Sequence, residues 1–143
     1  MLGTGHEQLV ADLVELARQH PDRIAVLERF DRDEARRIYA GSDLFLMPSR
    51  FEPCGQGQLI AMRYATPPVV RASGGLADTV ENYDEKTGDG TGFVFDDLTP
   101  KAIANSVGWA VWAWYNRPED IQRMRVRAMQ QRFSWEASAT RYV

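Results

Sequence analysis

Residues 43 to 72 read DLFLMPSRFEPCGQGQLIAMRYATPPVVRA, and this stretch decides the fold. Its first part, DLFLMPS, is apolar at consecutive positions, which predicts a strand buried on both faces, as in a parallel sheet. A helix is predicted over residues 56 to 65. PPVVRA then predicts a second strand with its prolines at the entry, where they are tolerated. Strand, helix and strand joined by a few residues predict a βαβ unit.

Upstream of this stretch the sequence predicts two helices and one strand. Thr4 and Glu7 have the spacing of a capping box and begin the first helix, which ends before Pro21. RIAVLERF, residues 23 to 30, is partly β-branched and predicts a strand. The second helix is expected from Asp31 to Gly41, a residue type common at helix ends. The opening letters MLGTG resemble the tail of a strand, so we expect the sheet to be incomplete at this edge.

Downstream of this stretch the alternation continues. SGGLADTVENY predicts a glycine turn and a short helix, DEKTGDGTG a polar loop, and FVF a last strand. Thr99 and Pro100 begin a helix that Pro118 breaks. EDIQRMRVRAMQQ predicts a further helix with solvated arginines, and Ser134 is expected to cap a C-terminal one. The expected inner face of the helix after Thr99 consists of Ile103, Ala104, Val107, Val111 and Trp114.

The composition bounds the class of protein. The chain has 143 residues, of which 44% are hydrophobic, and this is enough for one domain with a buried core. The net charge of -3 gives no support for a nucleic-acid or anionic-membrane partner. A single cysteine excludes an internal disulfide and a Cys-rich metal site, so we expect a reducing, cytoplasmic location. The sequence shows no signal-peptide pattern, and its longest apolar run, WAVWAWY, is too short to cross a bilayer.

The turn SRFEPCG lies where a ligand would bind, because open parallel sheets bind ligands at the carboxyl ends of their strands. The start of the following helix offers backbone N–H groups to an anion. Gly55 and Gly57 allow a ligand to approach the backbone closely. Glu52 could accept hydrogen bonds from hydroxyls, so the turn suits a sugar phosphate or a sugar nucleotide. The alternative is that Gly55 only shapes the turn and Glu52 only caps the helix.

The other candidate motifs are weaker. SGGLADTV, residues 73 to 80, also enters a helix, but alone it favours an ordinary tight turn with Asp78 and Thr79 in solvent. GTGHEQ matches the dinucleotide fingerprint only in part, since its third glycine is missing. Cys54 has no activating base nearby in the sequence, so we expect a small, buried, inert thiol. Phe30 ends a predicted strand and is interpreted as a hydrophobic plug, with stacking on a base as the alternative.

A family resemblance rests on residues 37 to 80, which read RIYAGSDLFLMPSRFEPCGQGQLIAMRYATPPVVRASGGLADTV. The pair SRFEPCG and GGLADTV is highly specific, and this stretch resembles the starch and bacterial glycogen synthases. TGFVF and FSWEASATRYV match the end of the same family. The resemblance therefore runs from Gly3 to the C-terminus.

This resemblance implies a retaining glycosyltransferase with two Rossmann domains. Members move glucose from ADP-glucose, or in some cases UDP-glucose, to the 4-hydroxyl of an α-1,4-glucan. No metal or other cofactor is implied. Residues 1 to 143 would be part of the C-terminal, donor-binding domain, a Rossmann-like parallel sheet with helices on both faces followed by C-terminal helices. The N-terminal acceptor domain, with its catalytic His and glucan surface, would be the missing partner.

The same resemblance implies a role for each matched residue. Glu52 matches the acid that holds the donor glucose hydroxyls near the reacting carbon, and it is the expected catalytic residue. Phe30 matches the aromatic residue, usually Tyr, that stacks on the adenine. The other expected donor-binding residues are Cys54 and Gly55 at the sugar, Gln56 and Gly57 at the distal phosphate, and Ser73, Gly74 and Gly75 at the turn near the sugar and diphosphate.

The chain also departs from the family. The family commonly has Leu-Thr where this chain has Gln56 and Gly57, so a hydroxyl near the phosphate is lost. Related transferases carry a second carboxylate eight residues after the first, at the position of Ile60. The Arg and Lys that clamp the diphosphate lie upstream of Gly3 in the family. We therefore expect this chain alone not to transfer glucose. A non-catalytic nucleotide-binding or interaction module is the alternative.

Overall fold

The computed structural model describes residues 1–133, which divide into two compact units. The first unit is Met1–Ile38, and the second begins at Tyr39. The boundary between them falls inside helix α2 (Arg32–Gly41). The C-terminal helix that Ser134 is expected to cap lies outside the described residues.

The first unit contains helix α1 (Glu7–Gln19) and an extended segment. The strand predicted over residues 23 to 30 is wrong, because in this segment only Leu27 forms a bridge, parallel to Leu2. The Gly3 N–H donates to the Leu27 carbonyl at 3.1 Å. One bridged pair does not extend into a ladder, so β-branched composition alone does not make a strand here.

The capping box predicted for α1 is also wrong. The N-cap is His6, and its side chain makes no cap hydrogen bond. Glu7 is therefore the first helical residue and not the third, so it lacks the position from which a capping box reaches back. The predicted end is confirmed, since the last helical residue is Gln19.

Helix α2 begins and ends as predicted. The Oδ1 of Asp31 accepts hydrogen bonds from the N–H groups of Asp33 at 3.1 Å and Glu34 at 3.0 Å. The Glu34 N–H is the largest of the contributions that lower the pKa of the Asp31 carboxyl. Gly41 is the last residue of the helix. Both ends depend on local hydrogen bonding and backbone freedom, which the sequence shows directly.

The second unit is built on a parallel three-stranded sheet in the order β1-β2-β3. Its register pairs Leu46 with Val69 and Val69 with Phe93. Strands and helices alternate along the chain, which confirms the predicted βαβ arrangement. The elements are β1 (Phe45–Met47), α3 (Gly57–Arg63), β2 (Pro68–Arg71), α4 (Gly75–Thr79), β3 (Phe93–Phe95), α5 (Pro100–Asn116) and α6 (Pro118–Gln130).

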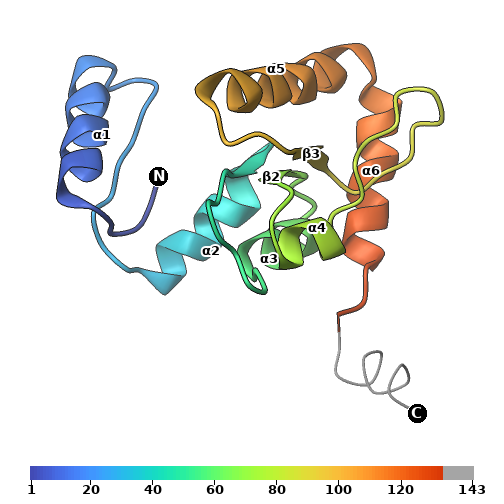
Figure 1. The fold of residues 1–143 in the computed structure, drawn as a ribbon, viewed down its shortest axis with the longest axis horizontal. Helices are drawn as coiled ribbons and strands as arrows, with labels where there is room; N and C mark the ends of the chain where they lie inside the picture. Colours follow the sequence, from blue (N-terminus) through green and yellow to red (C-terminus); the bar gives the residue numbers. More distant parts are fainter. Residues whose placement is uncertain (134–143) are drawn as a thin grey trace. The chain divides into compact units, whose positions relative to one another are not determined.

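Helices cover both faces of this sheet, and Figure 1 shows α5 on one side of the strands and α3 and α4 on the other. Val69 and Val70 are neighbours on β2, so their side chains point to opposite faces. Val69 packs in a buried cluster with Ala110 of α5 and Met124 of α6. Val70 packs against Leu76 of α4. The Rossmann-like α/β fold expected from the sequence is confirmed.

Strand β1 is less buried than predicted. Its central residue, Leu46, is 44% exposed, whereas Val69 and Val70 at the centre of β2 are at most 1% exposed. Leu46 faces the same side of the sheet as Val69 and Phe93, its neighbours in the register. Helix α5 packs on that side over β2 and β3. The prediction of burial on both faces is therefore wrong for β1, and it is β2 that is buried on both faces.

The start of α5 is confirmed, but its predicted inner face is partly wrong. Thr99 Oγ1 accepts a hydrogen bond from the Ala102 N–H at 3.1 Å and so caps the helix. Val111 is 41% exposed. The helix is apolar on several faces, so periodicity could not select one of them. Ile103, Val107 and Trp114 are half-buried and pack against the core as predicted, whereas the fully buried positions are the small residues Ser106, Ala110 and Ala113.

Candidate functional site

The first turn of the candidate site follows β1 and is closed by the Glu52 carboxylate. The Gly55 N–H donates to Glu52 Oε1 at 3.1 Å. Gly55 has a φ of 71°, a backbone conformation that side chains with a Cβ rarely adopt. An ionised carboxylate offers about four acceptor positions, so this bond leaves Glu52 able to accept from hydroxyls as well. Half-buried Glu52 thus shapes the turn and still has acceptor positions free for a hydroxyl donor.

The second turn follows β2, and its backbone lies directly against the first turn. The Gly75 N–H lies 3.3 Å from both the Glu52 and the Pro53 carbonyl oxygens. A Cβ added to Gly74 would overlap the Glu52 carbonyl oxygen, and one added to Gly75 would overlap the Cys54 carbonyl oxygen. These glycines are therefore needed because two stretches of backbone meet. The turn is more than the ordinary tight turn that its sequence favours.

The side chain of Gln58, which the sequence analysis did not single out, joins the first turn to helix α4, the helix that begins at the second turn. Gln58 on α3 is fully buried. Its Nε2 donates to the Gly55 carbonyl at 3.2 Å and to Thr79 Oγ1 at 3.0 Å. Thr79 is half-buried and bonded, so the prediction that it lies in solvent is wrong. A polar residue on the same helical face as buried Ala61 and Met62 was the available signal.

A second missed residue, Arg71, lies at the carboxyl end of β2. Its Nε donates to the Asp96 carbonyl at 3.0 Å. Its Nη1 donates to the Arg50 carbonyl at 3.0 Å and lies 3.4 Å from the Ser49 carbonyl. The guanidinium therefore connects the segments that leave β1 and β3, one on each side of its own strand. An arginine ending the apolar run PPVV was the signal for this role.

Gly57, at the start of α3, lies close to β1. A Cβ added there would be 3.1 Å from Met47 Sδ and 3.2 Å from a Phe45 ring carbon. These atoms belong to flexible or apolar side chains, so a larger residue would require a small shift. Gln56 precedes the helix as its N-cap, and its side chain makes no cap hydrogen bond. The helix start is thus formed by backbone geometry without a side-chain cap.

The structure brings together most of the residues predicted for the site. Phe30 belongs to the first unit, is 84% exposed and is not part of a strand, so its predicted contact with a base stays a prediction. Cys54 is exposed, and the expectation of a buried thiol is wrong because the turn directs only its carbonyl toward Gly75. The residues that lie together on the two turns are Glu52, Cys54, Gly55, Gln56, Gly57, Ser73, Gly74 and Gly75.

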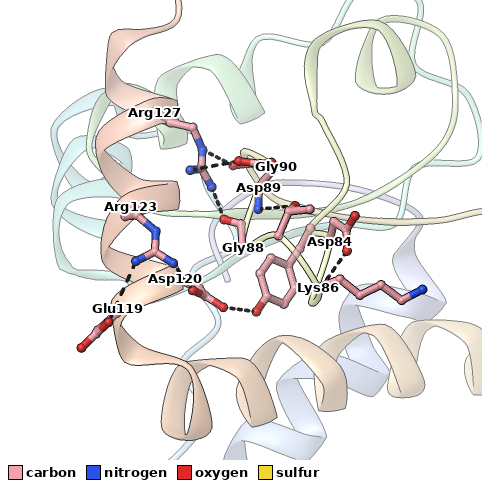
Figure 2. Close-up of polar contacts among 11 residues, drawn as sticks. Asp84, Lys86, Gly88, Asp89, Gly90, Glu119, Asp120, Arg123 and Arg127 are labelled. Carbon is pink, nitrogen blue, oxygen red and sulfur yellow. Dashed lines mark hydrogen bonds and ion pairs between the residues drawn. The ribbon is translucent and has the colours of Figure 1, made fainter.

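A polar hollow of about 800 Å³ lies elsewhere, between the loop before β3 and α6. Four of its six charged side chains, those of Glu85, Arg117, Asp120 and Arg123, pair with one another. Arg123 pairs with Asp120 and Glu119, and Nη2 of Arg117 lies 3.7 Å from Oε1 of Glu85. Figure 2 shows Arg123 directed at both of its carboxylate partners. These ion pairs reduce the charge that the hollow offers to a ligand.

The arginines of α6 are not simply solvated, contrary to the sequence-based prediction. Arg125 Nε donates to the Ala65 carbonyl at 2.9 Å. Arg127 donates to the carbonyls of Gly88 and Gly90, which Figure 2 shows on the loop facing the helix. These contacts hold the loop before β3 and the end of α3 against α6.

Tyr83 completes this second polar region. Its hydroxyl donates to Asp120 Oδ2 at 2.7 Å. Burial, followed by the hydrogen bond to Asp120, raises the pKa of Tyr83 to about 12. Among residues 1–133, no group of three or more His, Cys, Asp and Glu side chains is arranged to hold a metal ion. Within the same residues, no helix is long and apolar enough to cross a membrane.

This chain is similar in sequence to known proteins along its whole length. Residues 1–125 match the family described as glycosyl transferases group 1. The chain is 46% identical over 143 residues to a glycogen synthase of Treponema denticola and 47% identical over 143 residues to one of Syntrophotalea carbinolica. Each match covers 100% of this chain and 29% of the relative, so the chain spans less than a third of the proteins it resembles.

The fold comparison gives the same result. The catalytic domain of starch synthase IV from Arabidopsis thaliana, bound to ADP and acarbose, superposes with a TM-score of 0.86 at 32% identity. The alignment covers 98% of this chain and 29% of that protein. A sucrose-phosphate synthase from Thermosynechococcus elongatus, with a TM-score of 0.68 at 23% identity, shares the fold. The family match spans most of the sequence, and the chain belongs to the glycosyl transferases group 1 family.

Proposed function

We propose that this chain is the donor-binding part of a glucosyltransferase of the glycogen and starch synthase type. The observation that carries the proposal is the contact between the Glu52 turn and the Gly74–Gly75 turn at the carboxyl ends of β1 and β2. Open α/β sheets bind ligands at such ends. The similarity of this chain to part of the glycogen synthases supports glucose as the transferred sugar, and the ADP bound to the similar starch synthase IV structure supports ADP-glucose as the donor.

In this proposal the chain holds the donor in an orientation from which its glycosidic bond can break. Glu52 accepts hydrogen bonds from the glucose hydroxyls near the reacting carbon. The N–H groups at Gln56 and Gly57 face the diphosphate, where negative charge grows as the leaving group departs. Fixed dipoles of this kind stabilise the transition state more than the ground state. Residues 1 to 143 would act as part of a C-terminal donor domain, with no metal required.

The acceptor belongs to the rest of the enzyme in this proposal. The relatives are about three times longer than the chain, which covers 29% of them. We propose that an N-terminal domain supplies the α-1,4-glucan site and that this chain alone binds the donor without transferring glucose. A cytoplasmic enzyme would fit this role. Chain elongation detected after incubating this chain alone with ADP-glucose and glycogen would contradict that part of the proposal.

The experiment that tests the proposal compares two ligands and one substitution by titration calorimetry. Glu52→Gln keeps an oxygen that can accept from the Gly55 N–H, so the turn stays closed. It weakens only bonds that need the carboxylate, so we expect ADP-glucose affinity to fall about tenfold. ADP lacks the sugar, and its affinity should not change. Equal loss for both ligands, or no binding of either by the unmodified chain, would contradict the proposal.

A further inference from the structure

The starting observation is a buried oxygen without a hydrogen-bond partner. Gln58 is fully buried, and its Oε1 has no partner in the structure. A buried acceptor left unpaired reduces stability, and most such groups in native proteins are paired. An apolar residue of similar length would avoid this loss. The amide group must therefore do something that an apolar side chain could not.

The amide nitrogen identifies that role. The Gln58 Nε2 donates both of its hydrogens, one to the Gly55 carbonyl and one to Thr79 Oγ1. Both donors of the amide are thus used, while Oε1 is left without a donor of its own. Exchanging the amide nitrogen and oxygen of Gln58 would not give the oxygen a hydrogen-bond donor. The Thr79 hydroxyl already donates its hydrogen to the Gly75 carbonyl at 2.5 Å and can only accept from Gln58.

These bonds form a closed ring through both turns. From Gly55 the ring passes through Gln58 and Thr79 to the Gly75 carbonyl. The Gly75 N–H then returns to the Glu52 carbonyl at 3.3 Å. The Glu52 carboxylate accepts from the Gly55 N–H at 3.1 Å and closes the ring. Every member is held by two neighbours, so loosening one link loosens both turns.

We infer that Gln58 is a positioning residue for the donor site, and that it acts through Thr79 to hold the two glycine turns in one fixed arrangement. The inference rests on the proposed function, since the arrangement matters only if a ligand meets both turns. Gln58 itself is fully buried, so its proposed role is to support the turns and not to contact the donor. Its unpaired oxygen is the consequence of directing both donors at the ring.

The test uses the chain as it is, with substitutions at both ends of the link. Gln58→Met keeps length and burial but removes both donors, and Thr79→Val removes the hydroxyl with little change of shape. We expect each to weaken ADP-glucose binding roughly tenfold, and the double variant to be no weaker than either single variant, as for members of one network. Thr79→Ser restores the hydroxyl and should keep affinity within about twofold.

Ser106→Ala is the matched control. Ser106 lies on α5 and has the other buried side-chain oxygen without a partner in the part of the chain that the structure describes. Removing that oxygen should leave ADP-glucose affinity unchanged. If Gln58→Met likewise leaves affinity unchanged, or if the effects of Gln58→Met and Thr79→Val simply add, the inference is overturned.

A second readout keeps the inference separate from the proposed function. Amide hydrogen exchange at Gly55 and Gly75 reports both turns without any ligand. We expect Gln58→Met and Thr79→Val each to speed exchange at both amides while the melting temperature stays close to that of the unmodified chain. If the unmodified chain binds neither ADP-glucose nor ADP, the proposed function fails. The hydrogen-exchange measurement alone then decides whether Gln58 and Thr79 connect the two turns. Faster exchange at only one of the two amides would overturn it.

Discussion

Two polar regions of the second unit are built in opposite ways. In the paired glycine turns, Gly74 and Gly75 let one stretch of backbone meet another, and a neutral amide joins them. In the region around α6, charged side chains such as Arg123 and Asp120 satisfy one another (Figure 2). The first arrangement leaves a carboxylate and backbone N–H groups available to a ligand, whereas in the second most of the charged side chains are paired with one another. A charged hollow is therefore a poorer indicator of function than a backbone contact that only glycine permits.

The largest expected effect comes from a methyl group added at Gly75, and a methyl group added at Gly88 in the other region serves as its comparison. A methyl group at Gly75 would overlap the carbonyl oxygen and other backbone atoms of Cys54, which cannot move without breaking the turn. We expect Gly75→Ala to lower the free energy of unfolding by about 3 kcal/mol or more. Urea denaturation followed by circular dichroism measures this change.

Gly88→Ala is the matched substitution in the other region. Gly88 has a φ of 74°, and its added carbon would meet the ends of the Asp120 and Arg123 side chains at 2.8 to 3.0 Å. These ends can move, so the loss should be limited to the backbone strain, roughly 1–2 kcal/mol. If Gly88→Ala proved as damaging as Gly75→Ala, the contrast between the two regions would be wrong.

The next effect separates two arginines that both bind carbonyls. Arg71→Met releases carbonyls beside the candidate site, and Arg127→Met releases those of Gly88 and Gly90. Each should cost about 1–2 kcal/mol of stability, because charge-assisted hydrogen bonds are lost. Only Arg71→Met should also weaken ADP-glucose binding in calorimetry. Weaker binding in the Arg127→Met variant as well would show that the second region participates in the site.

The last effect is a pH dependence confined to the second region. The pKa of Tyr83 is raised to about 12, above the value of about 10 for an unfolded tyrosine. The folded state holds this proton more tightly, so the stabilisation is complete below about pH 10 and is lost as the pH rises toward 12. Tyr83→Phe should remove this component of the alkaline loss of stability. Denaturation curves of both forms across that range would reveal it, and identical pH profiles would contradict the assignment.

Local signals in the sequence predicted much of the local structure, although the capping box at Thr4 and the strand over residues 23 to 30 were wrong. The caps at Asp31 and Thr99 and the turn after β1 were all predicted correctly, because each depends on neighbours within a few residues. The parallel βαβ order followed from the same kind of signal. Most of the predicted site residues could be placed together because carboxyl ends of parallel strands share one edge.

What the sequence could not predict depends on residues far apart in the chain. The bond from Gln58 to Thr79 spans 21 positions, and that from Arg71 to Asp96 spans 25. The exposure of Leu46 depends on where α5 packs, which no local pattern records. The need for Gly75 comes from Cys54 on another turn. Each of these features becomes visible only when the two partners are seen in one structure.

The most direct test of the central claim is an NMR titration of the labelled chain with ADP-glucose, followed at the glycine amides. Glycines occur in both regions, and their amide signals report the backbone at residues that have no side chain of their own. We predict that the amide signals of Gly55, Gly57, Gly74 and Gly75 shift together along one binding curve, while those of Gly88 and Gly90 stay in place. Shifts confined to Gly88 and Gly90, or to only one of the two turns, would contradict the claim that the paired glycine turns form the donor site.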